Sequence, residues 1–131
     1  MGAIVYIDRS VIRSPDMKGL RTAVAGLTEF VRRREPQLLF YGFAIDEPAK
    51  TIHVVAVHPD SASLELHLKI GGPEFRKVGA FIDLQEITVF GELTEEIREQ
   101  LLAKGAALGS DARVHMYELA PGFERLAELG D

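Results

Sequence analysis

Hydrophobic and polar positions follow regular spacings along most of this chain, and the spacings predict its secondary structure. Ala3 to Asp8 is apolar and β-branched on both alternating faces, which predicts a strand covered on both sides. From Met17 to Val31 apolar residues recur every three or four positions, which predicts an amphipathic helix. The triplet Ser14-Pro15-Asp16 starts this helix with its serine as N-cap, and Glu35-Pro36 ends it, because a residue before proline disfavours the helical conformation.

Two further apolar runs, Leu38 to Ile45 and Lys50 to Val57, are predicted to form strands two and three. The residues Asp46-Glu47-Pro48-Ala49 between them suit a turn, so the pair is expected to be an antiparallel hairpin. Ile82 to Phe90 is predicted to be strand four, although its alternation of apolar and polar residues is mixed.

The segment from Ala62 to Ile70 supports two interpretations. Its apolar and polar residues alternate, as in a strand. However, Pro59-Asp60-Ser61 is typical of a helix start, and the leucines, glutamate and lysine that follow are good helix formers. Gly71-Gly72-Pro73 ends the element in either case, and Glu74 to Val78 is predicted to add one helical turn.

The last part of the chain predicts another helix and another strand. Thr94 is the expected N-cap, two glutamates follow it, Lys104 occupies the last turn as a cation suited to the helix dipole, and Gly105 stops the helix. Ala112 to Leu119 is predicted to be strand five. After Pro121-Gly122, a short amphipathic tail is expected with apolar residues at helical spacing: Phe123, Leu126 and Ala127.

This order of elements predicts an α+β fold. The first six elements, β-α-β-β-α-β, follow the ferredoxin-like plan, an antiparallel sheet with two helices on one face. We expect one domain over residues 1–131, with residues 93–131 as its C-terminal extension. The second sheet face is apolar on most strands, which predicts that another copy of the chain covers it in a homodimer.

Composition excludes several classes of partner. The net charge of −5 argues against nucleic acid, and no apolar run is long enough to cross a membrane. The chain has no cysteine, which excludes disulfides and thiolate chemistry. The N-terminus lacks the features of a secretory signal, so a cytoplasmic location is expected.

The four histidines carry most of the candidate chemistry. His53 and His58 lie five positions apart on one predicted strand and therefore point to opposite faces. No histidine spacing typical of a metal site is present, so no metal is expected. His58, at the end of its strand, is interpreted as capping the sheet rim and meeting water, with a place in a cavity wall as the alternative. His115 is expected to face solvent or a second subunit.

Aromatic residues on the predicted strands could form an apolar pocket. Most of them are expected in the core or an interface, and the candidates for contacting a small ligand are Tyr6, Tyr41 and Phe43, together with His58. Asp8, near the end of the first predicted strand, is expected to be a surface charge.

The window from Ile52 to Phe75 resembles the antibiotic biosynthesis monooxygenase-like proteins of the dimeric α/β-barrel superfamily. His53 to His58 corresponds to the family's strand, and Pro59-Asp60-Ser61-Ala62 to its helix start. His67 lies nine residues after His58 and matches the family's helix histidine. His58 stands where the family has a Trp, and the chain contains neither Trp nor Asn.

The resemblance implies that the segment after Pro59 is a helix and that the protein is a dimeric α/β barrel. It also implies a monooxygenase-like function without metal or organic cofactor, on a small apolar or aromatic substrate, with His67 as the candidate catalytic residue. The absent Trp and Asn favour the alternative, a non-catalytic dimeric ligand-binding or stress-response module of the same fold. Haem binding through His67 is a third interpretation.

Overall fold

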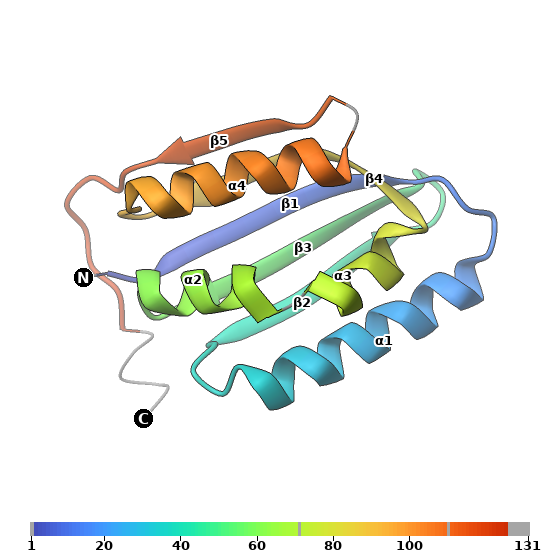
Figure 1. The fold of residues 1–131 in the computed structure, drawn as a ribbon, viewed down its shortest axis with the longest axis horizontal. Coiled ribbons are helices and arrows are strands. Elements are labelled where there is room, and N and C mark those ends of the chain that lie inside the picture. The colour runs from blue at the N-terminus through green and yellow to red at the C-terminus, as the bar shows by residue number, and fades with distance from the viewer. Residues whose placement is uncertain (1, 71, 110, 126–131) are drawn as a thin grey trace.

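The structure is a computed structural model that describes residues 2–70, 72–109 and 111–125. Four helices lie on one face of a five-stranded sheet (Figure 1). In chain order the elements are β1 (Ile4–Ile12), α1 (Met17–Arg34), β2 (Phe40–Asp46), β3 (Thr51–His58), α2 (Ser61–Ile70), α3 (Gly72–Gly79), β4 (Ile82–Phe90), α4 (Glu95–Leu108) and β5 (Arg113–Tyr117).

The sheet has the order β2-β3-β1-β4-β5, which confirms the predicted α+β, ferredoxin-like fold. β1 is central and pairs antiparallel with β3 and with β4, while β2 completes the predicted hairpin with β3. β5 pairs parallel with β4, so the whole sheet is mixed. Helix α4 provides the crossover that a parallel pair needs, because two parallel strands cannot be joined by a tight turn.

β1 extends four residues beyond the predicted end at Asp8, and this extension decides what lies inside. Alternate side chains of β1 face the helices and are buried, from Ile4 through Tyr6 and Asp8 to Ser10 and Ile12. Asp8 is therefore an interior residue in mid-strand, and the expectation of a surface charge was wrong. Two apolar clusters, one under α4 and one under α1 and α3, surround this row.

A β-bulge explains the mixed alternation of β4. Arg9 of β1 pairs with Glu86, but the next residue, Ser10, pairs with Leu84, so Gln85 is the extra residue. Leu84 therefore faces the helices on one side of the bulge, and Ile87 does so on the other.

Helix α1 confirms the predicted amphipathic pattern but begins differently. Asp16, rather than Ser14, is the N-cap, and its carboxylate accepts a hydrogen bond from the backbone N–H of Gly19 at 2.9 Å. Ser14 instead accepts from the N–H of Asp16 at 3.1 Å. Asp16 has the better position because only a residue directly before the first helical turn can reach its free N–H groups.

Helix α2 settles the ambiguous segment in favour of a helix. Asp60 accepts from the backbone N–H of Ser63 at 2.9 Å and so satisfies one free donor of the first turn. Ser63, Leu64 and His67 are buried at helical spacing, whereas a strand would bury every second residue.

Helix α4 continues past the predicted stop. Thr94 caps it as expected, accepting from the N–H of Ile97 at 3.2 Å, but the helix runs on to Leu108. Gly105 is a buried contact position, because a Cβ there would lie 3.0 Å from Val114 of β5. Lys104 accordingly does not cap a helix end.

The C-terminal segment departs from prediction in two ways. β5 is shorter than predicted, and residues 121–125 form no helix. Leu126 and Ala127 of the predicted amphipathic tail lie outside the described residues. Among the described residues, no helix is both long enough and apolar enough to span a bilayer.

The sheet face opposite the helices is graded from apolar to charged. No described helix covers it (Figure 1). One row across the five strands is apolar and consists of Phe40, Val57, Val5, Phe90 and Tyr117. Another row contains most of the charges and consists of Ala44, His53, Arg9, Glu86 and Arg113. Phe40 and Tyr117, at the two edges, are 55% and 50% exposed.

Candidate functional site

A buried histidine–carboxylate pair lies beneath the helices. His67 on α2 is 1% exposed and Glu35 is 2% exposed, and the Nδ1 of His67 lies 2.9 and 2.8 Å from the two carboxylate oxygens. Glu35 reaches this position because it is the C-cap of α1, where its backbone N–H donates to the carbonyl of Val31. The sequence indicated only that Glu35 ends the helix, and its role next to His67 was missed.

The surroundings of His67 favour a neutral imidazole. Burial lowers its pKa, and the hydrogen bond to Glu35 opposes this shift without reversing it. A carboxylate can only accept, so the neutral ring carries its proton on Nδ1. Nε2 then keeps a lone pair, and within the described residues it makes no hydrogen bond. His67 is buried and lines the cavity described next.

A cavity of about 50 Å³ lies between the sheet and the helices beside this pair. Four of the predicted site residues line it, namely His67, Tyr6, Tyr41 and Phe43. Most of the remaining wall is apolar, but Asp8, Ser10 and Lys104 also line it. The hydroxyl of Ser10 is buried without a hydrogen-bond partner among the described residues, so the cavity contains an unused polar group.

His58 is not among the residues that line the cavity. It is completely buried, and its Nδ1 lies 2.7 Å from the hydroxyl oxygen of Ser63, which also accepts a hydrogen bond from the side-chain amide of Gln37 at 3.0 Å. Burial, with His67 and Lys104 nearby, lowers the pKa of His58 to about 3. The prediction that His58 meets water at the sheet rim was wrong, because α2 folds over the strand end. The His58 ring packs 5.4 Å from the His67 ring and helps to position it.

Tyr6 and Asp8 form a second buried polar pair. The Tyr6 hydroxyl donates to the Asp8 carboxylate at 2.6 Å. Burial raises the pKa of both groups, and for Asp8 the nearby Lys104 opposes the shift. Tyr6 therefore stays protonated, and its hydroxyl is committed to Asp8. The place of Tyr6, Asp8 and Ser10 at every second position of β1 was the sequence signal that could have identified this pair.

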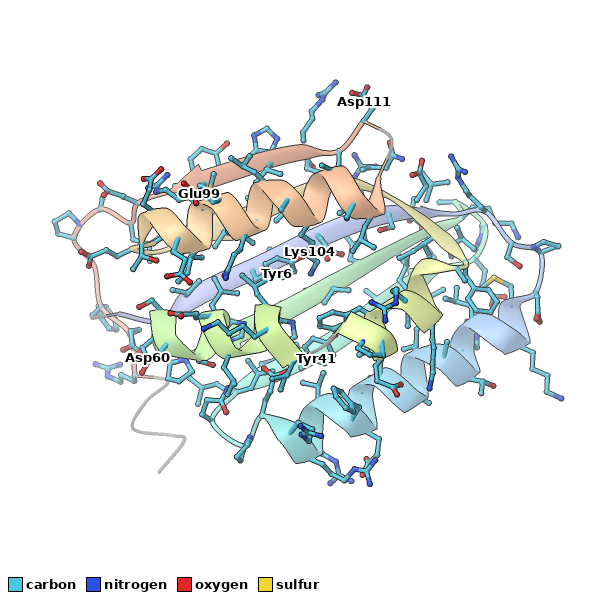
Figure 2. All side chains as sticks on the ribbon, in the orientation of Figure 1. Tyr6, Tyr41, Asp60, Glu99, Lys104 and Asp111 are labelled. Carbon is cyan, nitrogen blue, oxygen red and sulfur yellow. The ribbon has the colours of Figure 1, made fainter. Side chains whose placement is uncertain are left out.

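Lys104 enters the site from α4. Its Nζ lies 4.6 Å from the centre of the Tyr6 ring and 5.1 Å from the centre of the Phe75 ring. Figure 2 shows Lys104 reaching from α4 toward Tyr6 on β1. Burial lowers the pKa of Lys104, whereas Asp8 and Glu35 raise it. The two aromatic rings stabilise the charged amine, because a cation is attracted to a ring face.

A groove on the helical side adjoins the cavity. Its volume is about 460 Å³, and residues of α2, α3 and α4 form its walls. Phe75, Lys104 and Leu108 line both the groove and the cavity. The cavity alone is much smaller than typical ligand pockets of about 300–1,000 Å³. A ligand larger than a few water molecules exceeds the cavity, and displacement of these three side chains would join the cavity to the groove.

The other two histidines lie away from this site. His53 is on the uncovered sheet face, beside Arg9 of β1. His115 is on that face too, where its Nε2 lies 3.0 Å from a carboxylate oxygen of Glu86. Among residues 2–70, 72–109 and 111–125, no group of three or more potential metal-ligating side chains is close enough to hold an ion.

Comparison with known proteins identifies the fold. No family profile matches the sequence, and no curated protein matches it. The structure of MupZ from Pseudomonas fluorescens superposes with a TM-score of 0.70 at 20% identity, covering 95% of this chain and 96% of that one. SnoaB, a cofactor-independent oxygenase from Streptomyces nogalater, matches with a TM-score of 0.59 at 14% identity, covering 70% and 94%. A putative antibiotic biosynthesis monooxygenase from Caulobacter crescentus CB15 matches with 0.57 at 13%, covering 67% and 85%.

The chain thus has the fold of antibiotic biosynthesis monooxygenase-like proteins, and the similarity is structural at low sequence identity. The match to MupZ covers 95% of this chain, whereas the match to SnoaB covers 70%.

Proposed function

We propose that this protein is a cofactor-independent, monooxygenase-like enzyme that acts on a small apolar or aromatic substrate. The observation that carries the proposal is the neutral His67, held by Glu35 at the edge of a largely apolar cavity. An imidazole whose Nδ1–H is held by a carboxylate presents a basic Nε2 in one fixed orientation.

The first step is removal of a proton from substrate. His67 Nε2 takes the proton from an acidic C–H group, and the electron pair left behind is delocalised over the aromatic system. Glu35 keeps the ring in position and stabilises the imidazolium that forms, because the carboxylate lies against the N–H that carries part of its charge. His67 acts as general base, and Glu35 acts as a positioning residue.

The second step uses dioxygen as the oxidant. The substrate carbanion gives up electrons to O₂ and forms a C–O bond, and loss of water from the resulting hydroperoxide leaves a carbonyl. One methylene group and one O₂ thus yield one carbonyl and one water. The proton taken by His67 is returned to the departing oxygen. Tyr41 and Phe43 supply apolar walls that hold the ring system and keep bulk water away from the carbanion.

The small size of the cavity favours a second candidate function. A pocket of about 50 Å³ does not hold an aromatic ring system without rearrangement. A non-catalytic dimeric module, which binds a ligand in the outer groove or serves in a stress response, would need no such rearrangement. In that case His67 and Glu35 would serve only the packing of α2 against α1.

Oxygen consumption separates the two candidates. We would measure it with a panel of hydroquinones and anthrones for the wild type, His67→Ala and Glu35→Gln, with His53→Ala as the matched control on the other sheet face. If the protein is an enzyme, its turnover is expected to fall by about 100-fold or more in His67→Ala and to stay unchanged in His53→Ala. If the wild type shows no turnover above that of buffer, the enzyme is excluded and the non-catalytic binding module is supported.

We further propose a homodimer in which the uncovered sheet faces pack together. The support is the apolar row that crosses all five strands, with Phe40 and Tyr117 largely exposed at its ends. Contiguous apolar patches of this kind are rare on monomers. Each of the two packed faces carries one charged row, and these two rows would fix how one copy is oriented on the other.

A further inference from the structure

Among the residues that the structure describes, none accepts a hydrogen bond from the amine of Lys104. It lies over the rings of Tyr6 and Phe75, but among the described residues it makes no hydrogen bond and no ion pair. The nearest buried carboxylate on β1, Asp8, is engaged by the Tyr6 hydroxyl at 2.6 Å. An ammonium group carries three donors and no acceptor, so an oxygen atom supplied from outside the protein is its natural partner.

Lys104 also lies at the boundary between the inner cavity and the outer groove. It lines both the inner cavity and the outer groove, as Phe75 does. Phe75, the second residue of this boundary, packs against His67, and the centres of the two rings lie 5.1 Å apart. A planar ligand that displaces Phe75 would therefore lie between the imidazole of His67 and the amine of Lys104.

We propose that Lys104 is the oxyanion-binding residue of this site, where its ammonium group binds the phenol or enolisable ketone oxygen of the substrate. This inference rests on the proposed function and adds a second residue that contacts the substrate. As His67 Nε2 takes the proton, the electron pair moves through the conjugated system to the oxygen, which then accepts a hydrogen bond from the Lys104 ammonium. Unfunctionalised hydrocarbons, which offer no such oxygen, and cationic compounds are excluded as substrates.

The sequence placed Lys104 at a helix end, where its charge would serve the dipole. Two observations support the different role. The amine of Lys104 lies over two rings that come from different elements, Tyr6 of β1 and Phe75 of α3. Burial lowers the pKa of Lys104 although Asp8 and Glu35 raise it, so an oxygen atom that accepts from the ammonium group would stabilise its charged form.

The test uses 4-nitrophenol, whose ionised form is distinguished by its absorbance. We would titrate it with wild-type protein, Lys104→Met, Lys104→Arg and the control Lys69→Met, and follow the bound probe over a range of pH. Lys69 is an exposed lysine of α2, paired with Glu65. Methionine matches the length of lysine and packs well against aromatic rings, so Lys104→Met is expected to fold, which its thermal melting would verify.

Wild type and Lys69→Met are expected to bind the phenolate and to increase the ionisation of bound 4-nitrophenol by about tenfold or more over free probe. Lys104→Met is expected to lose this increase, and Lys104→Arg to keep most of it. The proposal is overturned if wild type fails to bind the phenolate, or if Lys104→Met ionises the bound probe as well as wild type does.

Parallel oxygen measurements keep the two proposals apart. Lys104-dependent phenolate binding without any oxygen consumption would overturn the monooxygenase and support the oxyanion site. The opposite outcome is oxygen consumption by the wild type, with the same rate and the same probe ionisation in Lys104→Met. That outcome would overturn the oxyanion site and support the monooxygenase.

Discussion

The imidazole of His67 and the carboxylate of Glu35 meet at 2.8 Å although 32 residues separate them in sequence. The end of α1 and the middle of α2 are thereby joined inside the protein. Both side chains are almost completely buried, so the pair is isolated from solvent charges that would weaken its interaction. A substitution in this pair should therefore shift the pH dependence of activity.

Replacing Glu35 by Gln should change both the rate and the pH profile of oxygen consumption. The carboxylate raises the pKa of His67, so its removal lowers that pKa further. The acid limb of kcat/KM, which reports protonation of the base, is expected to move to lower pH, while the plateau falls by about 100-fold. A rate loss with an unmoved acid limb would show that Glu35 does not contact the catalytic base.

His58 should make the protein sensitive to acid. Its folded pKa is about 3, well below the ordinary value of 6.5, so the unfolded chain binds one more proton between these values. Stability contributed by neutral His58 is complete above pH 6.5 and is lost as the pH falls toward 3. The slope for this one group is about 1.4 kcal/mol per pH unit.

Urea denaturation of wild type and His58→Gln between pH 7 and 4 measures this contribution. As the pH falls, the free energy of unfolding of His58→Gln is expected to decrease less steeply than that of the wild type. The difference in slope is up to about 1.4 kcal/mol per pH unit. His53→Gln, on the opposite face of the same strand, serves as the control. Parallel stability curves for wild type and His58→Gln would contradict the prediction.

Two helix glycines should respond oppositely to alanine. Gly26 lies in α1, and a Cβ added there would meet no neighbouring atom within 4 Å, so Gly26→Ala is expected to stabilise the protein by about 0.5–1 kcal/mol. A Cβ at Gly105 would lie 3.0 Å from Val114 and 3.7 Å from Ala112, so Gly105→Ala should lose that gain. Gly105→Leu is expected to cost more, because α4 must move away from β5. Equal gains for both alanine variants in thermal denaturation would contradict this.

A charge on the uncovered sheet face should prevent dimer formation. Val55 lies near the centre of that face, between β1 and β2. Val55→Lys is expected to sediment as a monomer at concentrations where the wild type is a dimer, because the lysine would have to be buried without a partner. Leu102→Lys, at an exposed position on α4, is the matched control and should leave the mass unchanged. A wild type that sediments as a monomer would overturn the dimer.

Local spacing was sufficient to predict most of the fold. The stripe of α1, the hairpin of β2 and β3 and the bounds of β4 depend on short-range patterns, and the structure agrees with them. Helix α2 was ambiguous because its leucines alternate as well as recur, and the resemblance to a family decided it. The N-cap of α1 was displaced by two residues, because Ser14 and Asp16 are both good caps.

The site was predicted less completely, because burial depends on contacts between distant segments. His67, Tyr6, Tyr41 and Phe43 do line one cavity, and this follows from their positions on inward-facing elements. Their roles in binding or catalysis stay predictions. Glu35 and Lys104 were assigned to helix ends, where charges are usual, and only the packing of α2 and α4 reveals them as interior groups.

The bulge at Gln85 has a consequence for how relatives should be aligned. Even-numbered residues of β4 face the helices before the bulge, and odd-numbered residues face them after it. The extra residue at the bulge keeps both halves in register with β1, whose alternation is continuous. A relative with a regular fourth strand must therefore carry a one-residue gap opposite Gln85. An alignment that places the gap elsewhere would match the buried positions of one half with the outward positions of the other. At an identity of 20%, as with MupZ, residue matches give little guidance, and this parity rule fixes the correspondence of β4 residue by residue.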